Sequence, residues 1–302
     1  YKRQVGSFAH RLPADRLVAN PKHRAESEEL WNIPQGTLNP KVGYDLMKML
    51  RGLEDGSLNF LWTQVVNIFQ STPNNTHWIQ AARKPENFVV VSDVYPTFSG
   101  ACADLILPAA MHFEKWGFYG NGERRTQGWQ QMVKPTGDSR TDVWMMMEFS
   151  KHFTVDECWG PQHVAGVEGD TLPDVRTTAH AMGISGNATL FDVLFAPSEK
   201  RQAVWPDPLY KNGLNTTGEA LGLPYLPEKA LWNEYRQFTL GHGHDLADFD
   251  TYMRDDVHGL LWPVVNGKET LWRYNTDTDP YAKADNLFYG PLMKEIPSGD
   301  LY

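Results

Sequence analysis

The chain has 302 residues, 41% of them hydrophobic, which is enough for one large domain or two modest ones with their own cores. Its 37 acidic residues outnumber its 28 basic residues and give a net charge of −9. A basic nucleic-acid-binding surface is therefore not expected. The longest apolar stretch, around residues 105–113, is too short to form a transmembrane segment. The two cysteines, Cys102 and Cys158, cannot build a disulfide framework or a cysteine metal cage, and we expect Cys102 to be a buried small side chain.

The first elements follow from apolar spacing and from breaker residues. Residues 1–40 read as irregular, because prolines are spaced through them. A helix is predicted from Asn39-Pro40 to the turn at residues 55–57, since apolar residues recur on one face at positions 42, 46, 49, 50 and 53. Residues 58–66 and 88–91 are apolar runs of strand length. The second run, FVVV, is continuous rather than alternating, which is typical of a parallel strand buried on both faces.

The remaining elements complete an alternating pattern. Helices are predicted over residues 96–107, 142–153 and 226–238, the second capped by Ser139 or Thr141. This alternation predicts an α/β fold with a Rossmann-like parallel sheet flanked by helices. Residues 154–228 are loop-rich, and residues 240–302 read as a surface-covering extension rather than a second sheet. We therefore expect an α/β region over 1–154 and a loop-rich extension over 155–302.

Polar residues follow both predicted strands. Asn67 follows the first strand, and Ser92 and Asp93 follow the second. Ligands of open parallel sheets bind beyond the carboxyl ends of the strands. A carboxylate there can accept hydrogen bonds from both N1–H and the N2 amino group of guanine. An Asp in this place can equally cap a helix or form a turn, and spacing alone does not separate these roles. No glycine-rich phosphate loop follows either strand, so an ordinary dinucleotide or triphosphate fold is disfavoured.

Two further segments are rich in polar residues. Residues 114–127 (EKWGFYGNGERRTQ) combine glycines with dense charge, and the pattern alone indicates a solvated loop with surface ion pairs. The motif His242-Gly-His244-Asp245 has the residue types of a metal site. Its flanking glycines and the lack of a neighbouring His/Asp cluster in the sequence argue against that use. No metal ligand is therefore predicted in this chain.

Taken together, the order of strand, Ser-Asp, ADLILP and EKWGFYGNGERRTQ in residues 89–127 resembles the molybdopterin oxidoreductase family, which includes formate dehydrogenases and nitrate reductases. Residues 5–24, 141–154, 241–250 and 259–274 are similar to the periplasmic nitrate reductases of that family. The resemblance extends over roughly residues 1–290 and is weakest between 155 and 225. The family's full subunits are much longer, so we expect this chain to be an internal part of one.

The resemblance implies that the α/β region binds one of two molybdopterin guanine dinucleotides. The matching positions are Asn67, Ser92, Asp93, Lys115 and Asp142. Ser92 and Asp93 would read the guanine, Lys115 would contact an anion, and Asp142 would be a second carboxylate for donors on the cofactor. A helix N-cap charge is the alternative role for Asp142. Relatives usually have an Asn-rich turn where this chain reads VVNIFQ (residues 65–70), and Asn67 alone is retained there.

The resemblance further implies a reaction and its partners. Nitrate would be reduced to nitrite by oxygen-atom transfer at a molybdenum bis(molybdopterin guanine dinucleotide) centre, in the periplasm, with electrons from a dihaem cytochrome c. The cysteine ligand of molybdenum and the ligands of a 4Fe-4S cluster are expected outside these residues. No catalytic residue is therefore assigned here, and the segment alone should be inactive. The alternatives are an assimilatory nitrate reductase, a formate dehydrogenase relative, or a non-catalytic subunit of the same fold without the cofactor.

Overall fold

The computed structural model describes residues 9–160, 162–163, 171–172, 174–195 and 213–282. The chain forms two compact units, each made of two stretches: residues 1–115 with 131–230, and residues 116–130 with 231–302. The predicted division of the chain into an α/β region over 1–154 and a loop-rich extension over 155–302 stays a prediction. No helix in the described part combines the length and apolar character that crossing a membrane requires.

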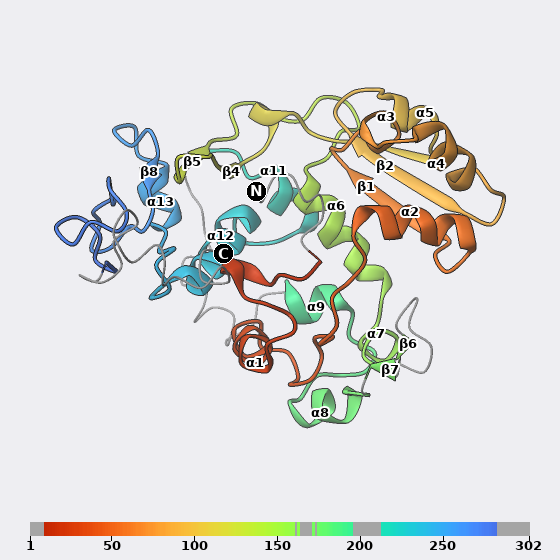
Figure 1. Ribbon diagram of the computed structural model, residues 1–302, viewed down its shortest axis with the longest axis horizontal. Coiled ribbons are helices and arrows are strands. Elements are labelled where there is room, and N and C mark those ends of the chain that lie inside the picture. Colours follow the sequence, from red (N-terminus) through yellow and green to blue (C-terminus); the bar gives the residue numbers. More distant parts are fainter. Residues whose placement is uncertain (1–8, 161, 164–170, 173, 196–212, 283–302) are drawn as a thin grey trace, which may run out of the picture. The chain divides into compact units, whose positions relative to one another are not determined.

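The first unit contains a parallel sheet, as predicted. Its strands β1 (Phe60–Gln64), β2 (Phe88–Asp93) and β3 (Leu105–Pro108) lie in the order β1-β2-β3 (Figure 1). Both strand pairs are parallel. The two apolar runs seen in the sequence therefore lie side by side, and their carboxyl ends meet at one edge. The α/β class with a parallel sheet flanked by helices is confirmed.

Three helices share one core with the sheet: α2 (Leu46–Asp55), α3 (Ile68–Ser71) and α4 (Asn75–Ala82). The residue that follows α5 (Phe98–Ala101), Cys102, belongs to the same core. The buried residues of this core are Leu50, Leu53, Leu61, Ile68, Phe69, Trp78, Ala82, Val89, Val91 and Cys102, so the predicted burial of Cys102 is confirmed. Helix α2 ends at Gly56 in the left-handed region, as its turn signal predicted. It begins later than predicted, because the Asp45 side chain accepts from the Lys48 amide and caps it.

The prediction of an irregular segment over residues 1–40 was wrong for residues 21–30; residues 1–8 lie outside the described residues. Helix α1 (Pro21–Leu30) follows a short 3-10 turn, η1 (Pro13–Asp15). Asn20 caps it through the Lys22 amide at 3.0 Å, and Pro21 occupies its first turn. The buried side chain of Glu28 accepts from the amides of Gly36 and Leu38, at 3.0 and 2.7 Å. This helix is held by polar contacts, and apolar spacing did not reveal it.

The predicted helix over residues 96–107 was also wrong in its second half, where the chain forms β3. The Asp104 carboxylate accepts from the amide of Val89 at 2.7 Å, which fixes the start of the strand. Leu105, Ile106 and Leu107 then pair with β2. Pairing with a neighbouring strand therefore decides the conformation of residues whose local propensity also suits a helix.

The rest of the first unit consists of short elements. They are η2 (His112–Glu114), α6 (Asp142–Phe149), η3 (Ser150–His152), α7 (Val155–Cys158), β6 (Gln162–His163), β7 (Thr171–Leu172), α8 (Arg176–Ala181), α9 (Leu190–Leu194), α11 (Thr216–Leu221) and the start of α12 (Pro227–Thr239). The predicted helices near 142 and 226 are confirmed, and Thr141 is the cap of α6. The loop-rich reading of residues 154–228 missed α7, α8, α9 and α11, because helices of four to six residues are too short to show an apolar period in the sequence.

The second unit is built on an antiparallel sheet. Strands β4 (Gly117–Gly120), β5 (Arg125–Trp129) and β8 (Leu260–Leu261) lie in the order β4-β5-β8, with α13 (Phe249–Tyr252) in the same unit. The Phe118 ring stacks on Trp232 with a centroid distance of 3.6 Å and contacts Phe249 edge-on. The prediction that residues 240–302 would contribute to no second sheet was wrong for β8. Its two residues are too few for a strand pattern in the sequence.

Asn87 is expected to be a main polar support of the first unit. Its buried side chain donates to the carbonyls of Leu53 and Ala81, at 2.9 and 2.8 Å, and so joins the ends of α2 and α4 below β2. Asn87→Ala would leave both carbonyls without this donor and should lower the free energy of unfolding by about 2 kcal/mol. Urea denaturation of the full-length protein measures this, with exposed Glu86→Ala as the control. Equal stability of the two variants would contradict the assignment.

Candidate functional site

The carboxyl edge of the parallel sheet continues past β3 through backbone hydrogen bonds. The Ala109 amide donates to the Asp93 carbonyl at 3.0 Å, and the Ala110 amide donates to the Arg140 carbonyl at 2.8 Å. Arg140 also donates its amide to Pro108 at 3.0 Å. This ladder joins the end of β2 to the residue two positions before α6. It therefore brings Asp93 and Asp142, which are 49 positions apart in the sequence, to the same edge.

Lys115 and Asp142 form an ion pair at this edge. The Lys115 ammonium contacts Asp142 Oδ2, and 18% and 29% of the two side chains are exposed. The turn before Lys115 is fixed by Glu114, which accepts from the Met111 amide and the Thr136 hydroxyl, both at 2.8 Å. The Met111 hydrogen bond is the main cause that lowers the pKa of Glu114. The turn before Lys115 and the hydrogen bonds through Arg140 thus bring the two predicted site residues together, although 26 residues separate them in the sequence.

Three polar atoms near this edge are buried and have no hydrogen-bond partner among the described residues. They are Asp142 Oδ1, Gln64 Nε2 and Trp144 Nε1. Gln64 ends β1 in register with Ser92, and Trp144 lies in the first turn of α6. A buried carboxylate oxygen without a donor costs free energy, and a bound ligand with N–H groups would satisfy it. Sequence reasoning missed Gln64 and Trp144, because neither belongs to a recognisable motif.

Asn67 joins β1 to the neighbouring helices. Its side-chain oxygen accepts from the amide and hydroxyl of Ser99, at 3.0 and 2.6 Å, and its nitrogen donates to Gln70 at 2.6 Å. The Ser99 hydroxyl accepts in turn from the amide of Phe69. These contacts explain in physical terms why an amide side chain stands at this position. The predicted cofactor contact of Asn67 stays a prediction.

Ser92 is fully buried at the end of β2. Its hydroxyl accepts from the indole N–H of Trp62 at 2.6 Å, and its carbonyl accepts from Val65 at 2.8 Å. Asp93 is partly exposed, and its carboxylate accepts from the Tyr95 amide at 3.2 Å. One Asp93 oxygen is therefore engaged in a turn. The predicted guanine contacts of both residues stay predictions.

A cavity of about 310 Å³ lies between α6 and the sheet. Most of its lining is apolar, and two acidic and two basic side chains contribute polar groups. The lining residues are Trp62, Leu107, Pro108, Asp138, Arg140, Trp144, Met145, Glu148, Phe149 and His152. Trp62 contacts Phe149 edge-on at 5.1 Å across it. The cavity therefore adjoins the carboxyl end of β3 and the residues that lead into α6.

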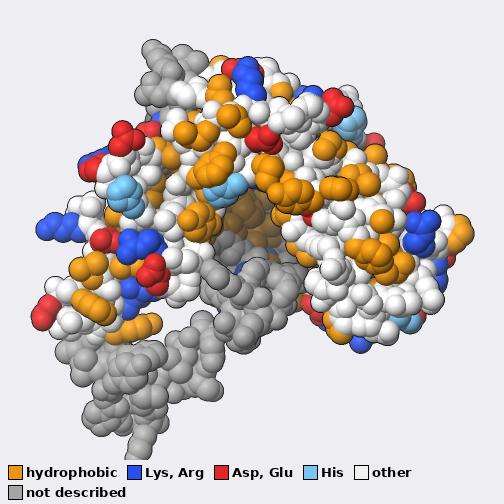
Figure 2. All heavy atoms as spheres, turned by 90° about the horizontal axis from the view of Figure 1, so that it is seen from above, with side chains coloured by type: hydrophobic (Ala, Val, Ile, Leu, Met, Phe, Trp, Pro, Cys, Tyr) orange, Lys and Arg blue, Asp and Glu red, His pale blue; other side chains and the backbone are white. Residues whose placement is uncertain are grey.

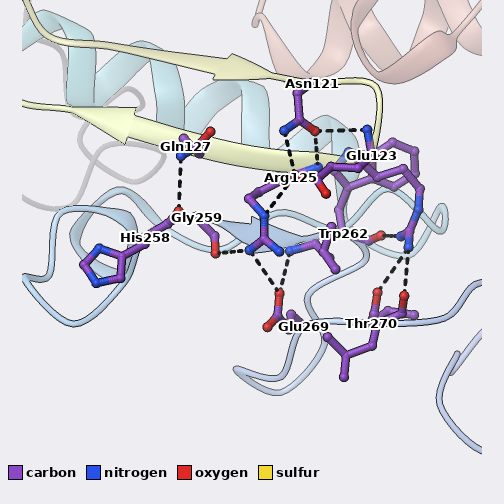
Figure 3. A network of polar contacts seen from close by, with 12 residues as sticks. Asn121, Glu123, Arg125, Gln127, His258, Gly259, Trp262, Glu269 and Thr270 are labelled. Carbon is purple, nitrogen blue, oxygen red and sulfur yellow. Dashed lines mark hydrogen bonds and ion pairs between the residues drawn. The ribbon is translucent and has the colours of Figure 1, made fainter.

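The segment from Asn121 to Gln127 supports the second unit. Asn121 accepts from the amides of Glu123 and Arg125, at 3.1 and 3.0 Å, and shapes the turn between β4 and β5 (Figure 3). Arg125 donates to the Gly259 carbonyl at 2.9 Å, and Gln127 donates to the His258 carbonyl at 3.2 Å. The prediction of a merely solvated loop was therefore wrong. These side chains fasten the chain before β8 to the hairpin.

The histidine motif also contributes to structure. Asp245 is buried and accepts from the Gly241 amide at 2.8 Å and from the Tyr281 hydroxyl at 3.0 Å. The His244 ring lies 5.0 Å from the Trp262 ring. In the part of the chain that the structure describes, no group of three or more His, Cys, Asp or Glu residues is arranged to hold a metal ion.

Charged side chains of both signs occur together on one face of the molecule (Figure 2). On the face drawn in Figure 2, Lys and Arg side chains are interspersed with Asp and Glu, and hydrophobic side chains lie between them.

Comparisons with known proteins agree on a family. Residues 4–152 match the family model of the molybdopterin oxidoreductases. The periplasmic nitrate reductase of Campylobacter fetus subsp. fetus is 50% identical over 317 aligned positions, which cover 99% of this chain and 34% of that protein. The chain thus spans about a third of the length of this curated relative. Acetylene hydratase from Pelobacter acetylenicus is a solved structure with 16% identity and a TM-score of 0.32, over 42% of this chain and 18% of that one. That score is too low to bear on fold or function.

Proposed function

Because the chain belongs to the molybdopterin oxidoreductase family, we propose that it forms part of a molybdenum enzyme that reduces nitrate to nitrite. Its own contribution is to bind one molybdopterin guanine dinucleotide at the carboxyl edge of the parallel sheet. The identity to a protein named periplasmic nitrate reductase, maintained over 99% of the chain, supports nitrate as the substrate and the periplasm as the location. A dihaem cytochrome c as electron donor and a 4Fe-4S cluster held elsewhere in the protein belong to the same proposal.

The buried oxygen of Asp142 carries the assignment of the site. Asp142 Oδ1 has no donor among the described residues, while Oδ2 is paired with Lys115. Guanine and pterin rings offer N–H donors, and a carboxylate is their natural acceptor. The diphosphate of the cofactor is anionic, and an ammonium group has three donors, of which Lys115 uses one for Asp142. The residues present therefore fit the chemistry of the group.

The residues divide the binding task by charge. We propose that Asp93 and Asp142 accept from the ring donors and that Lys115 contacts a phosphate. Ser92 and Asn67 are assigned to the same cofactor, with Ser92 fixing Trp62 and Asn67 fixing the end of β1. When bound, the molybdenum supplies the oxygen-atom transfer. The protein groups described here bind and orient the cofactor and perform no step of the reaction themselves.

The proposal is tested by the metal and nucleotide content of the full-length protein. We expect molybdenum and two guanine dinucleotides per chain after purification, together with nitrate reduction by a reduced dye. A folded protein without molybdenum would overturn the proposal in favour of a non-catalytic subunit. Molybdenum with activity towards formate and none towards nitrate would overturn the substrate assignment.

Asp93→Asn tests the guanine contact. The amide can still accept from Tyr95, but it offers one acceptor where guanine presents two donors. Loss of a bidentate pair should lower cofactor affinity about ten-fold, measured as nucleotide retained after dialysis. Asp255→Ala, at an exposed position, is the control. Retention equal to that of the wild-type protein would remove Asp93 from the site.

A further inference from the structure

A buried chain of hydroxyl groups lies behind the first turn of α6. The Thr141 hydroxyl accepts from the Trp144 amide at 3.2 Å, and it lies 2.8 Å from the hydroxyl of Thr217 in α11. The Thr217 hydroxyl donates to Glu228 Oε1 at the start of α12. Thr141 and Thr217 are each 2% exposed and Glu228 is 8% exposed. Water therefore has little access to this chain of contacts.

With Glu228 as the final acceptor, the donor of each hydrogen bond in this chain of hydroxyl groups is fixed. The Thr217 hydroxyl has a single proton, which goes to Glu228, so Thr141 must donate to Thr217. Thr141 is then free to accept from the Trp144 amide and cap the helix. Each link thus orients the next, from the carboxylate to the helix end. Burial raises the pKa of Glu228, and the hydrogen bond from Thr217 opposes that shift.

The two helices that supply Thr217 and Glu228 are fastened to each other. Asn215 accepts from the Gly218 amide at 3.0 Å, which caps α11, and donates to the Tyr225 carbonyl at 2.9 Å. A Cβ atom at Gly218 would lie 2.5 Å from that same carbonyl, so a glycine is required for this close approach. Helix α11 also contacts α6 directly, as Figure 1 shows. The start of α12 is therefore a fixed support rather than a loose end.

We propose that Thr217 and Glu228 are positioning residues of the cofactor-binding site, an inference that rests on the proposed function. They fix the position and direction of the first turn of α6. Asp142 lies in this turn and pairs there with Lys115. Neither residue is expected to touch the cofactor. Their removal would displace the Asp142 carboxylate and its unpartnered oxygen, although both ligand-contacting side chains would remain in the sequence.

Four variants of the full-length protein test the inference. Thr217→Val removes the hydroxyl with little change in shape, and Glu228→Leu removes the final acceptor. Both should lose molybdenum and guanine dinucleotide on dialysis about ten-fold faster than the wild-type protein. Glu228→Gln keeps an oxygen that accepts from Thr217 and should retain the cofactor as the wild-type protein does. Asn87→Ala removes contacts that lie outside the hydrogen-bonded chain from Thr141 to Glu228. This variant should lose stability without the faster loss of cofactor.

A second readout is independent of the cofactor. Amide hydrogen exchange over residues 142–146 should become faster in Thr217→Val and Glu228→Leu and stay unchanged in Glu228→Gln. A wild-type protein that contains no molybdenum would overturn the proposed function together with this inference. A wild-type protein that contains it, with Thr217→Val retaining it as long as Asn87→Ala does, would overturn the positioning role alone.

Discussion

A Lys115→Glu variant of the full-length protein is expected to purify with less than about a tenth of the wild-type molybdenum and guanine dinucleotide. The change removes the cation paired with Asp142 and adds a carboxylate beside it, where the proposal puts an anionic diphosphate. Two unit charges about 4 Å apart near a protein surface interact by about 4 kcal/mol at an effective dielectric constant of about 20. A ten-fold change in affinity needs only about 1.4 kcal/mol, so reversing the sign exceeds it even after screening by salt.

Two comparisons make the result specific. Lys134→Glu reverses a charge in the same unit, at a side chain that is 66% exposed and 3.7 Å from Glu219, and should keep its cofactor. Lys115→Met removes the attraction without adding repulsion and should fall between the two. Lys115→Glu protein with wild-type molybdenum content would show that Lys115 does not contact the cofactor. Content lost in Lys134→Glu to the same extent would show that net charge, rather than this site, is responsible.

The sequence predicted those parts of the fold whose pattern is apolar. The runs at residues 58–66 and 88–91 became β1 and β2, and their continuous apolar character indicated parallel pairing correctly. Helix α1 was missed because polar contacts of Asn20 and Glu28 hold it, and these have no periodicity. Strand β3 was missed because its short run suits a helix until β2 pairs with it. An apolar pattern indicates which face of an element is buried, but it does not indicate which other element packs against that face.

The candidate site divides in the same way. That polar residues follow the strands, and that Asp93 lies at the sheet's carboxyl edge, could be read from the order of residues. The pairing of Lys115 with Asp142 depends on the ladder through Ala109, Ala110 and Arg140, which no local pattern encodes. The hydrogen-bonded chain from Thr141 through Thr217 to Glu228 is even harder to predict from the sequence, since it joins three helices through single hydroxyl groups.

Arg124→Ala is expected to open the segment that surrounds β8 in the second unit. The Arg124 guanidinium donates to the carbonyls of Trp262, Thr270 and Leu271, the last two at 3.3 and 3.4 Å. The guanidinium carbon, Cζ, also lies 5.6 Å from the centre of the Trp262 ring, which is close enough for a cation–π interaction. Burial lowers the pKa of Arg124, and the group stays charged at neutral pH. Alanine would leave three backbone carbonyls without their donor, at a cost of about 3 kcal/mol.

Hydrogen exchange over residues 259–272 of the full-length protein measures this cost, because amides there bond within the same segment, including Thr270 to the Leu261 carbonyl at 3.0 Å. A loss of about 3 kcal/mol should speed their exchange about 100-fold. Arg124→Lys should lose most of the protection as well, since one ammonium cannot reproduce the planar fork that contacts three carbonyls. Arg254→Ala, which breaks an exposed pair with Asp256, should leave exchange unchanged. If exchange in Arg124→Ala is no faster than in Arg254→Ala, Arg124 does not stabilise this segment, and its role is that of the surface charge which the sequence pattern suggested.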